Sequence, residues 1–231
     1  MSTQTTKMAD EKEKDGLVNN VDDLKMSRGE KPEIVVDMEK LKNLYVYDEM
    51  ENKIRFSDIY KHQKTIIVFT RHFLCFVCKD YMEDLGIIPL EYLQAADVRI
   101  VAIGPAPCKF IKPFKKETGF NYTLYTDPER EVYKTLNLKE KMVHGDEKNS
   151  KHVKQSPFMG ILRSTWKAMK VQEYEGNIKQ QGGAFIMGPG DVVHFAHIDE
   201  NSLDHTPIND LLEKAGVAPV SFPKDKRVQH L

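Results

Sequence analysis

Two cysteines spaced C-x-x-C, Cys75 and Cys78, are the residues of this chain whose type and spacing are best suited to chemistry. An apolar run at residues 65–70 and a short turn at 71–74 precede them, and apolar side chains recur at helical spacing after them. The pattern predicts a buried strand, a turn, and a helix whose first turn carries both thiols. A sulfur there lies near unpaired backbone N–H groups and the positive end of the helix dipole, which favour the thiolate.

Basic side chains flank the cysteine pair. Arg71 and His72 precede Cys75, and Lys79 follows Cys78. Positive charge lowers the pKa of a thiol and raises the fraction of nucleophilic thiolate at neutral pH. We therefore assign catalytic roles to the two cysteines and supporting roles to Arg71, His72 and Lys79. Because the first cysteine of such a pair is normally the more exposed one, we expect an alkylating agent to label Cys75 before Cys78.

Three alternative roles for the pair stay open: a zinc site, a structural disulfide, and an inert pair of small hydrophobic residues. A zinc site needs two further ligands, but the chain has only three cysteines. His194 and His197 are three residues apart in a predicted strand, so they face opposite sides. A disulfide between adjacent helical turns closes a very small loop and constrains the unfolded chain little. We favour a redox-active pair, with no metal and no cofactor.

The third cysteine, Cys108, follows a second apolar run at residues 98–104 and a Pro-rich turn. It is either a small residue that packs near the start of a helix or an alternative resolving or regulatory thiol. Cysteine commonly behaves as a small hydrophobic residue, which favours the packing role.

Charge and hydropathy exclude several classes of protein. The chain has 231 residues, of which 34 are basic and 35 acidic, so a net charge of −1 gives no electrostatic reason to expect nucleic acid or an anionic membrane as a partner. The first residues contain no apolar core of a secretory signal, and no stretch approaches the length of a transmembrane helix. We expect a cytoplasmic or nuclear protein, where thiols stay reduced unless they are in use.

The chain divides into a charged N-terminal tail at 1–31 that we expect to be disordered, a domain at 32–221, and a polar tail at 222–231. Periodicity, turn residues and helix caps predict the elements of the domain. The predicted strands are residues 44–48, 53–56, 65–70, 98–104, 122–126, 181–187 and 192–196. The predicted helices are residues 57–62, 75–96 with an interruption near 87–89, 107–118, 127–136, 156–169 and 208–215.

Strands that alternate with helices indicate an α/β fold with parallel central strands, and the final hairpin adds an antiparallel edge. The strands that end near residues 70 and 104 should be neighbours with their C-terminal ends at one edge of the sheet, where such folds place their sites. Cys75 and Cys108 both follow that edge. We expect Cys75 at or just before the first turn of its helix.

Four segments resemble the peroxiredoxin-like 2 family, which carries the AhpC/TSA antioxidant domain of the thioredoxin-like superfamily. They are RHFLCFVCKDYMEDL at 71–85, TDPEREVYKTLNL at 126–138, QGGAFIMGPGDVVHFAH at 181–197 and LDHTPINDLL at 203–212. The resemblance covers about residues 33–221. It implies a thioredoxin-like fold, with a mixed central sheet, helices on both faces and a C-terminal antiparallel hairpin.

The resemblance also implies a reaction. A peroxide would oxidise Cys75 to a sulfenic acid, Cys78 would resolve it as an intrachain disulfide, and an external thiol reductant such as thioredoxin would reduce that disulfide. A protein disulfide is the alternative substrate.

Two positions depart from true peroxiredoxins. True peroxiredoxins have a threonine three residues before the attacking cysteine, where this chain has His72. They also have an arginine before the terminal hairpin, where this chain has Gly182. Arg71 and Arg163 are candidates to supply the missing charge. The departures favour a second function, a non-enzymatic redox sensor or regulatory protein on the same scaffold, whereas the retained cysteine pair favours an enzyme.

Overall fold

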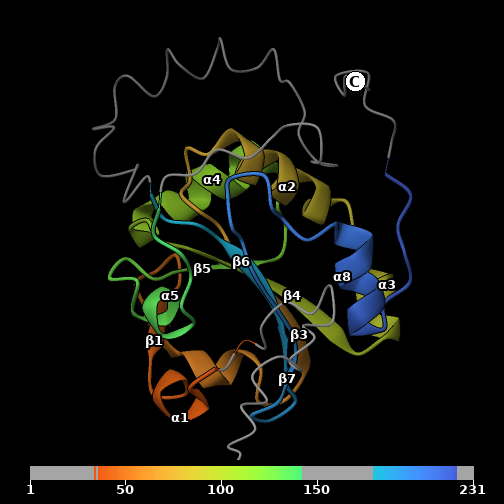
Figure 1. Cartoon of the computed structure of the whole chain (residues 1–231). Coiled ribbons are helices and arrows are strands. Elements are labelled where there is room, and N and C mark those ends of the chain that lie inside the picture. The colour runs from red at the N-terminus through yellow and green to blue at the C-terminus, as the bar shows by residue number, and fades with distance from the viewer. Residues whose placement is uncertain (1–33, 35, 142–178, 223–231) are drawn as a thin grey trace, which may run out of the picture. The chain divides into compact units, whose positions relative to one another are not determined.

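The computed structural model describes residue 34, residues 36–141 and residues 179–222 (Figure 1). Within these residues, one sheet has the strand order β2-β1-β5-β4-β3-β6-β7. Its strands are β1 (Tyr45–Tyr47), β2 (Lys53–Arg55), β3 (Lys64–Phe69), β4 (Val98–Gly104), β5 (Thr123–Thr126), β6 (Gly183–Met187) and β7 (Val193–Ile198).

Helices cover both faces of this sheet. One core contains side chains of α2 (Phe76–Gly86), α3 (Leu90–Ala95), α4 (Ile111–Thr118) and α8 (Ile208–Ala215). The other contains side chains of α1 (Met38–Leu41), the 3₁₀ helix η1 (Phe56–Ile59) and α5 (Glu131–Thr135). Figure 1 shows α2 and α4 on the opposite side of the sheet from α1 and α5. The mixed α/β architecture with helices on both faces is confirmed.

The central strands determine which loops meet. Strand β3 pairs in parallel with β4 and antiparallel with β6, and β7 pairs antiparallel with β6. Two reversals of direction make β7 run the same way as β3. The C-terminal ends of β3, β4 and β7 therefore lie at one edge of the sheet, and the predicted adjacency of the strands that end near residues 70 and 104 is confirmed.

Local sequence explains the helix that follows β3. Cys75 is the N-cap residue of α2, as expected, at the C-terminal end of a strand with a parallel neighbour. The helix ends at Gly86, and Pro89 is the N-cap of α3, so the predicted interruption near 87–89 is also confirmed.

Three predicted helices differ in detail. The one at 57–62 is the shorter 3₁₀ helix η1, and the one at 107–118 begins as the 3₁₀ turn η2 (Cys108–Phe110) before α4. The helix predicted from residue 127 starts only at Glu131, because Arg130 adopts a left-handed conformation with φ of 57°. Asp127 still caps it, since its carboxylate accepts hydrogen bonds from the backbone N–H groups of Glu131, Val132 and Tyr133.

Several expectations fall on other parts of the chain. The tail at 1–31, residues 223–231 of the predicted tail at 222–231, the helix at 156–169 and Arg163 lie outside the described residues. Of the helices that are described, none has the length and apolar content that a bilayer span requires.

Phe73 fixes the turn between β3 and α2. Its ring is fully buried and stacks on Phe114 of α4, with ring centroids 4.2 Å apart. It also lies directly over Gly104 of β4, where an added Cβ would approach within 2.2 Å of the ring. The turn that carries Arg71 and Cys75 is therefore held to the sheet by an aromatic side chain that only a glycine at position 104 admits.

Phe73→Ala should lower the free energy of unfolding by about 3–5 kcal/mol, because it removes a fully buried aromatic ring and leaves a cavity. Phe76→Ala, three residues further on, removes a ring that is 48% exposed and should change that free energy by only about 0.5 kcal/mol. Equilibrium urea unfolding of both variants measures the difference. Equal losses would show that Phe73 does not anchor the turn.

Candidate active site

The sulfur of Cys75 forms part of the N-terminal cap of α2. The backbone of Cys75 is extended, with φ of −68° and ψ of 114°, and its Sγ accepts a hydrogen bond from the backbone N–H of Cys78 at 3.4 Å. Its carbonyl accepts the first helical bond, from the N–H of Lys79 at 3.0 Å. Cys75 thus takes the place that serine or aspartate usually has at a helix start, and one N–H of the first helical turn is directed at the sulfur.

A cation completes the surroundings of this sulfur. Nη1 of Arg71, a buried side chain in the turn after β3, donates to Cys75 Sγ at 3.4 Å. The neighbouring Cys78 side chain, with the charges of Arg71 and His72, holds the pKa of Cys75 well below its ordinary value, although burial opposes the shift. Cys75 is therefore the thiolate of the pair.

Cys78 has the opposite character. Burial and the neighbouring Cys75 thiolate raise the pKa of Cys78 well above its ordinary value, so it carries the proton of the pair. Both cysteines are free thiols in this structure. The two sulfurs are thus differentiated as a nucleophile and a proton-bearing partner.

Two expectations about this pair need correction. Cys75 is 4% exposed and Cys78 is 2% exposed, so the first cysteine is not appreciably more accessible than the second. Lys79 forms an ion pair with Glu117 of α4, with Nζ 2.6 Å from Oε1, so its charge is neutralised at that helix. Arg71, rather than Lys79, supplies the cation in contact with the Cys75 sulfur.

Cys108 begins the turn η2 at the same edge of the sheet, and it is partly buried. Burial first, and then the negative charge of Glu51, raise the pKa of Cys108 above its ordinary value. A protonated thiol beside a carboxylate is a poor nucleophile, which agrees with a packing role.

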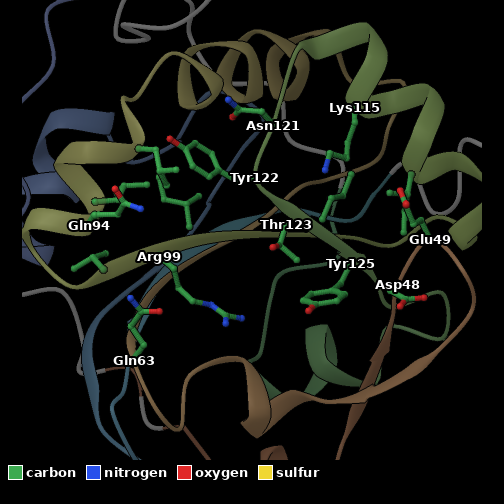
Figure 2. A pocket seen from close by; sticks show the side chains of 16 residues that line it. Asp48, Glu49, Gln63, Gln94, Arg99, Lys115, Asn121, Tyr122, Thr123 and Tyr125 are labelled. Atoms are coloured by element: carbon green, nitrogen blue, oxygen red, sulfur yellow. The ribbon is translucent and has the colours of Figure 1, made fainter.

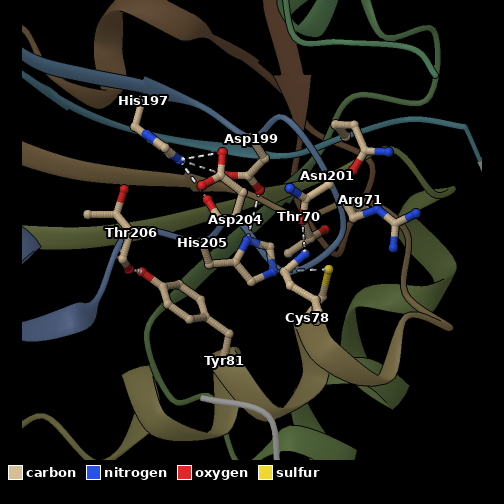
Figure 3. Close-up of polar contacts among 12 residues, drawn as sticks. Thr70, Arg71, Cys78, Tyr81, His197, Asp199, Asn201, Asp204, His205 and Thr206 are labelled. Atoms are coloured by element: carbon tan, nitrogen blue, oxygen red, sulfur yellow. Dashed lines mark hydrogen bonds and ion pairs between the residues drawn. The ribbon is translucent and has the colours of Figure 1, made fainter. Parts of the chain in front are cut away.

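Sequence patterns did not indicate a second polar group beside the pair, formed by Asp199 and His205 (Figure 3). Nε2 of His205 lies 3.8 Å from Cys78 Sγ, and Nδ1 of the same ring lies 2.8 Å from Asp199 Oδ2. His197 contacts the other oxygen of that carboxylate at 3.4 Å. Burial opposes ionisation of Asp199, but His205 and His197 hold its pKa below its ordinary value.

The loop that carries these residues is held against α2. The Tyr81 hydroxyl donates to the carbonyl of Thr206 at 2.7 Å, and the Tyr81 ring lies 4.9 Å from that of His205. The N–H of Asp199 donates to the carbonyl of Gly182 at 3.1 Å. Bonds to α2 and to the sheet thus keep the His205 imidazole in place over Cys78.

One signal for this group was available in the sequence. Asp199 directly follows β7, the second strand of the terminal hairpin. Because β6 is antiparallel to both β3 and β7, the C-terminal end of β7 lies at the edge of the sheet where Cys75 lies. Polar residues after that strand are therefore expected near the cysteine pair.

The atoms packed around Gly182 explain why this position does not hold an arginine. A Cβ there would lie 2.3 Å from the carbonyl oxygen of Phe69 and 2.9 Å from Asp199 Oδ2. The space for a side chain is already occupied, and Arg71 approaches Cys75 from the turn after β3 instead.

Metal-ligating side chains and a cavity are two other candidates for a site among the described residues. No group of three or more His, Cys, Asp or Glu side chains in the described part of the chain is arranged to hold a metal ion. A cavity of about 660 Å³ lies beside β4 and β5, with Arg99, Thr123 and Tyr125 among its walls (Figure 2). Its lining includes neither cysteine of the pair, so it is separate from the thiol site.

Comparison with known proteins identifies the family. A family model described as AhpC/TSA antioxidant enzyme matches residues 90–201, which begin after the cysteine pair. Peroxiredoxin-like 2C of Mus musculus is 41% identical over 190 residues, which cover 81% of this chain and 84% of the relative. Peroxiredoxin-like 2C of Takifugu rubripes is 40% identical over 197 residues, which cover 83% and 87%.

A solved structure supports the fold independently. The peroxidoxin BcpB from Mycobacterium tuberculosis superposes with a TM-score of 0.52 at 13% identity, covering 75% of this chain and 91% of that one. At this level of identity the likeness concerns the fold, which is the thioredoxin-like fold that the sequence predicts. The chain therefore belongs to the peroxiredoxin-like 2 family of AhpC/TSA-type redox proteins.

Proposed function

We propose that this protein is a thiol-dependent oxidoreductase in which Cys75 is the nucleophile and Cys78 the resolving cysteine. The observation that carries the proposal is the Cys75 sulfur at the start of α2, which accepts hydrogen bonds from Arg71 Nη1 and from the backbone N–H of Cys78. Both donors stabilise a thiolate, which is the reactive form towards peroxides and disulfides.

The reaction begins when the Cys75 thiolate attacks one oxygen of a hydroperoxide. The O–O bond breaks, the leaving alkoxide or hydroxide takes a proton, and Cys75 becomes a sulfenic acid. Cys78 then attacks that sulfur, water leaves, and a Cys75–Cys78 disulfide forms. An external dithiol such as thioredoxin reduces the disulfide by exchange. With a protein disulfide as the substrate, the same two cysteines act through a mixed disulfide.

A second function, redox sensing without turnover, is favoured by the burial of both sulfurs, since Cys75 is 4% exposed and Cys78 is 2% exposed. Little of either residue is open to a protein reductant. Consumption of NADPH in a peroxide assay coupled to thioredoxin and its reductase separates the two functions. Sustained turnover supports the enzyme, whereas one oxidation per chain without recycling supports the sensor.

Cys75→Ser should abolish peroxide consumption, because it removes the thiolate. Cys78→Ser should leave the first oxidation of Cys75 intact but stop turnover, with Cys75 held as a sulfenic acid or mixed disulfide. Trapping with a sulfenic-acid reagent, followed by intact-mass measurement, distinguishes these states. Cys108→Ser serves as the matched control and should turn over like the unmodified protein. Full activity of Cys75→Ser would refute the nucleophile assignment.

Arg71→Gln should raise the pKa of Cys75, because it removes the cation in contact with the thiolate. The pH dependence of alkylation of Cys75 should then move to higher pH. Lys79→Gln is the control, since the ammonium of Lys79 pairs with Glu117 and its loss should leave the curve in place. A larger shift in Lys79→Gln than in Arg71→Gln would contradict the geometry.

Mild peroxide treatment should link Cys75 to Cys78 and leave Cys108 mostly free, because Cys78 lies in the first turn of α2 and its backbone N–H donates to the Cys75 sulfur at 3.4 Å. Peptide mapping by mass spectrometry under non-reducing conditions measures the pairing. A dominant bridge from Cys75 to Cys108 would transfer the resolving role to the third cysteine.

A further inference from the structure

We infer that His205, held by Asp199, is the base that removes the proton of Cys78 when this cysteine attacks oxidised Cys75. The inference rests on the proposed function, in which Cys78 is the resolving cysteine. It adds a catalytic residue, His205, and a positioning residue, Asp199, from a segment more than 120 positions away along the chain. Nothing in the cysteine motif itself supplies this base.

Resolution needs a proton acceptor other than Cys75. In the reduced pair, Cys75 carries the negative charge and Cys78 beside it carries the proton. Once Cys75 is a sulfenic acid or a mixed disulfide, that negative charge is gone, while Cys78 is still buried and protonated. A thiol must become a thiolate to attack sulfur, so a second acceptor must lie within reach of Cys78.

His205 meets this requirement. Its Nε2 is 3.8 Å from Cys78 Sγ, within the hydrogen-bond range of sulfur. Asp199 is 1% exposed and ionised, and its Oδ2 accepts a hydrogen bond from Nδ1–H of His205 at 2.8 Å. Because Nδ1 carries the proton, the lone pair of the neutral ring is on Nε2 and points towards the thiol (Figure 3).

The charges around the ring favour proton uptake. Burial opposes the imidazolium form, but the Asp199 carboxylate raises the pKa of His205 above its ordinary value, against a smaller opposing effect of Arg71. The Cys75 thiolate adds to this effect in the reduced pair only, whereas the effect of Asp199 remains after Cys75 is oxidised. Tyr81 packs against the ring from α2 and stays neutral, because burial raises the pKa of its hydroxyl. His197 shares the Asp199 carboxylate and competes with His205 for its charge.

In the resolving step, Cys78 transfers its proton to Nε2 of His205, and the resulting thiolate attacks Sγ of the Cys75 sulfenic acid. The S–S bond forms as the S–O bond breaks, and the departing hydroxide takes the proton from the imidazolium and leaves as water. The hydroperoxide is the oxidant consumed in the preceding step. In a mixed disulfide, the departing thiolate takes the proton instead.

An aromatic disulfide such as dithiodipyridine isolates this step. The Cys75 thiolate attacks it and releases one thiopyridone, and Cys78 then displaces the second from the mixed disulfide. At acidic pH the second release is slow, so the mixed disulfide accumulates. A jump to neutral pH in a stopped-flow instrument starts resolution and measures its rate alone.

His205→Asn should slow the second release about 100-fold at neutral pH, since general-base catalysis contributes at least that factor. The asparagine amide can still donate to Asp199 in the place of Nδ1, while the position of Nε2 is left without an acceptor. The first release should keep its rate.

Asp199→Asn should slow the second release as well, because an amide facing Nδ1 favours the tautomer with its proton on Nε2. His194→Asn, at an exposed position of β7, should match the unmodified protein.

The pH profile separates a base from a merely structural residue. The unmodified protein should resolve faster as pH rises through the titration of His205 and then level off. In His205→Asn the rate of the second release should continue to rise at higher pH, because Cys78 then ionises without a base. The difference in this rate between the variant and the unmodified protein should therefore narrow. An unchanged second release in His205→Asn, or a deficit that stays constant across the pH range, would overturn the assignment. If His205→Asn instead slowed the first release and left the second one normal, Cys78 would be the thiol that attacks first. That outcome would contradict the assignment of Cys75 as the nucleophile.

Discussion

The hydrogen bond from the backbone N–H of Cys78 to the sulfur of Cys75 is the interaction on which the site depends. A helix start has backbone N–H groups without helical partners, and a buried one needs an acceptor. A thiolate accepts more strongly than a thiol, so the bond that begins α2 also favours ionisation of Cys75. The position of this bond depends in turn on Phe73, which fixes the preceding turn over Gly104.

Burial explains why charged groups occur here in partnered sets. Arg71 contacts the Cys75 sulfur, and His205 contacts Asp199, with both partners of each contact largely removed from solvent. An isolated charge in such surroundings is costly, whereas a charge with a hydrogen-bonded partner of opposite sign is tolerated. The same low exposure strengthens the interactions that distinguish the pKa of Cys75 from that of Cys78.

Sheet topology brings these partners together. Strand β3 leads into the turn of Arg71 and Cys75, and β7 leads into the loop of Asp199 and His205. The intervening β6 is antiparallel to both, so the two loops emerge at one edge. The bond from Tyr81 to Thr206 then fastens the second loop to α2. Two segments that are distant along the chain therefore share one buried site.

The amino-acid sequence by itself determined the strand, turn and helix around Cys75, because periodicity, glycine and proline act over a few residues. It also indicated a low pKa for Cys75, since a helix start and nearby basic residues are local features. Only the tertiary structure decided which cation reaches the sulfur: Lys79 is drawn to Glu117 on α4, and Arg71 is left in contact. It also decided that His205 lies over Cys78, because a contact between residues so far apart depends on strand pairing rather than on any local pattern.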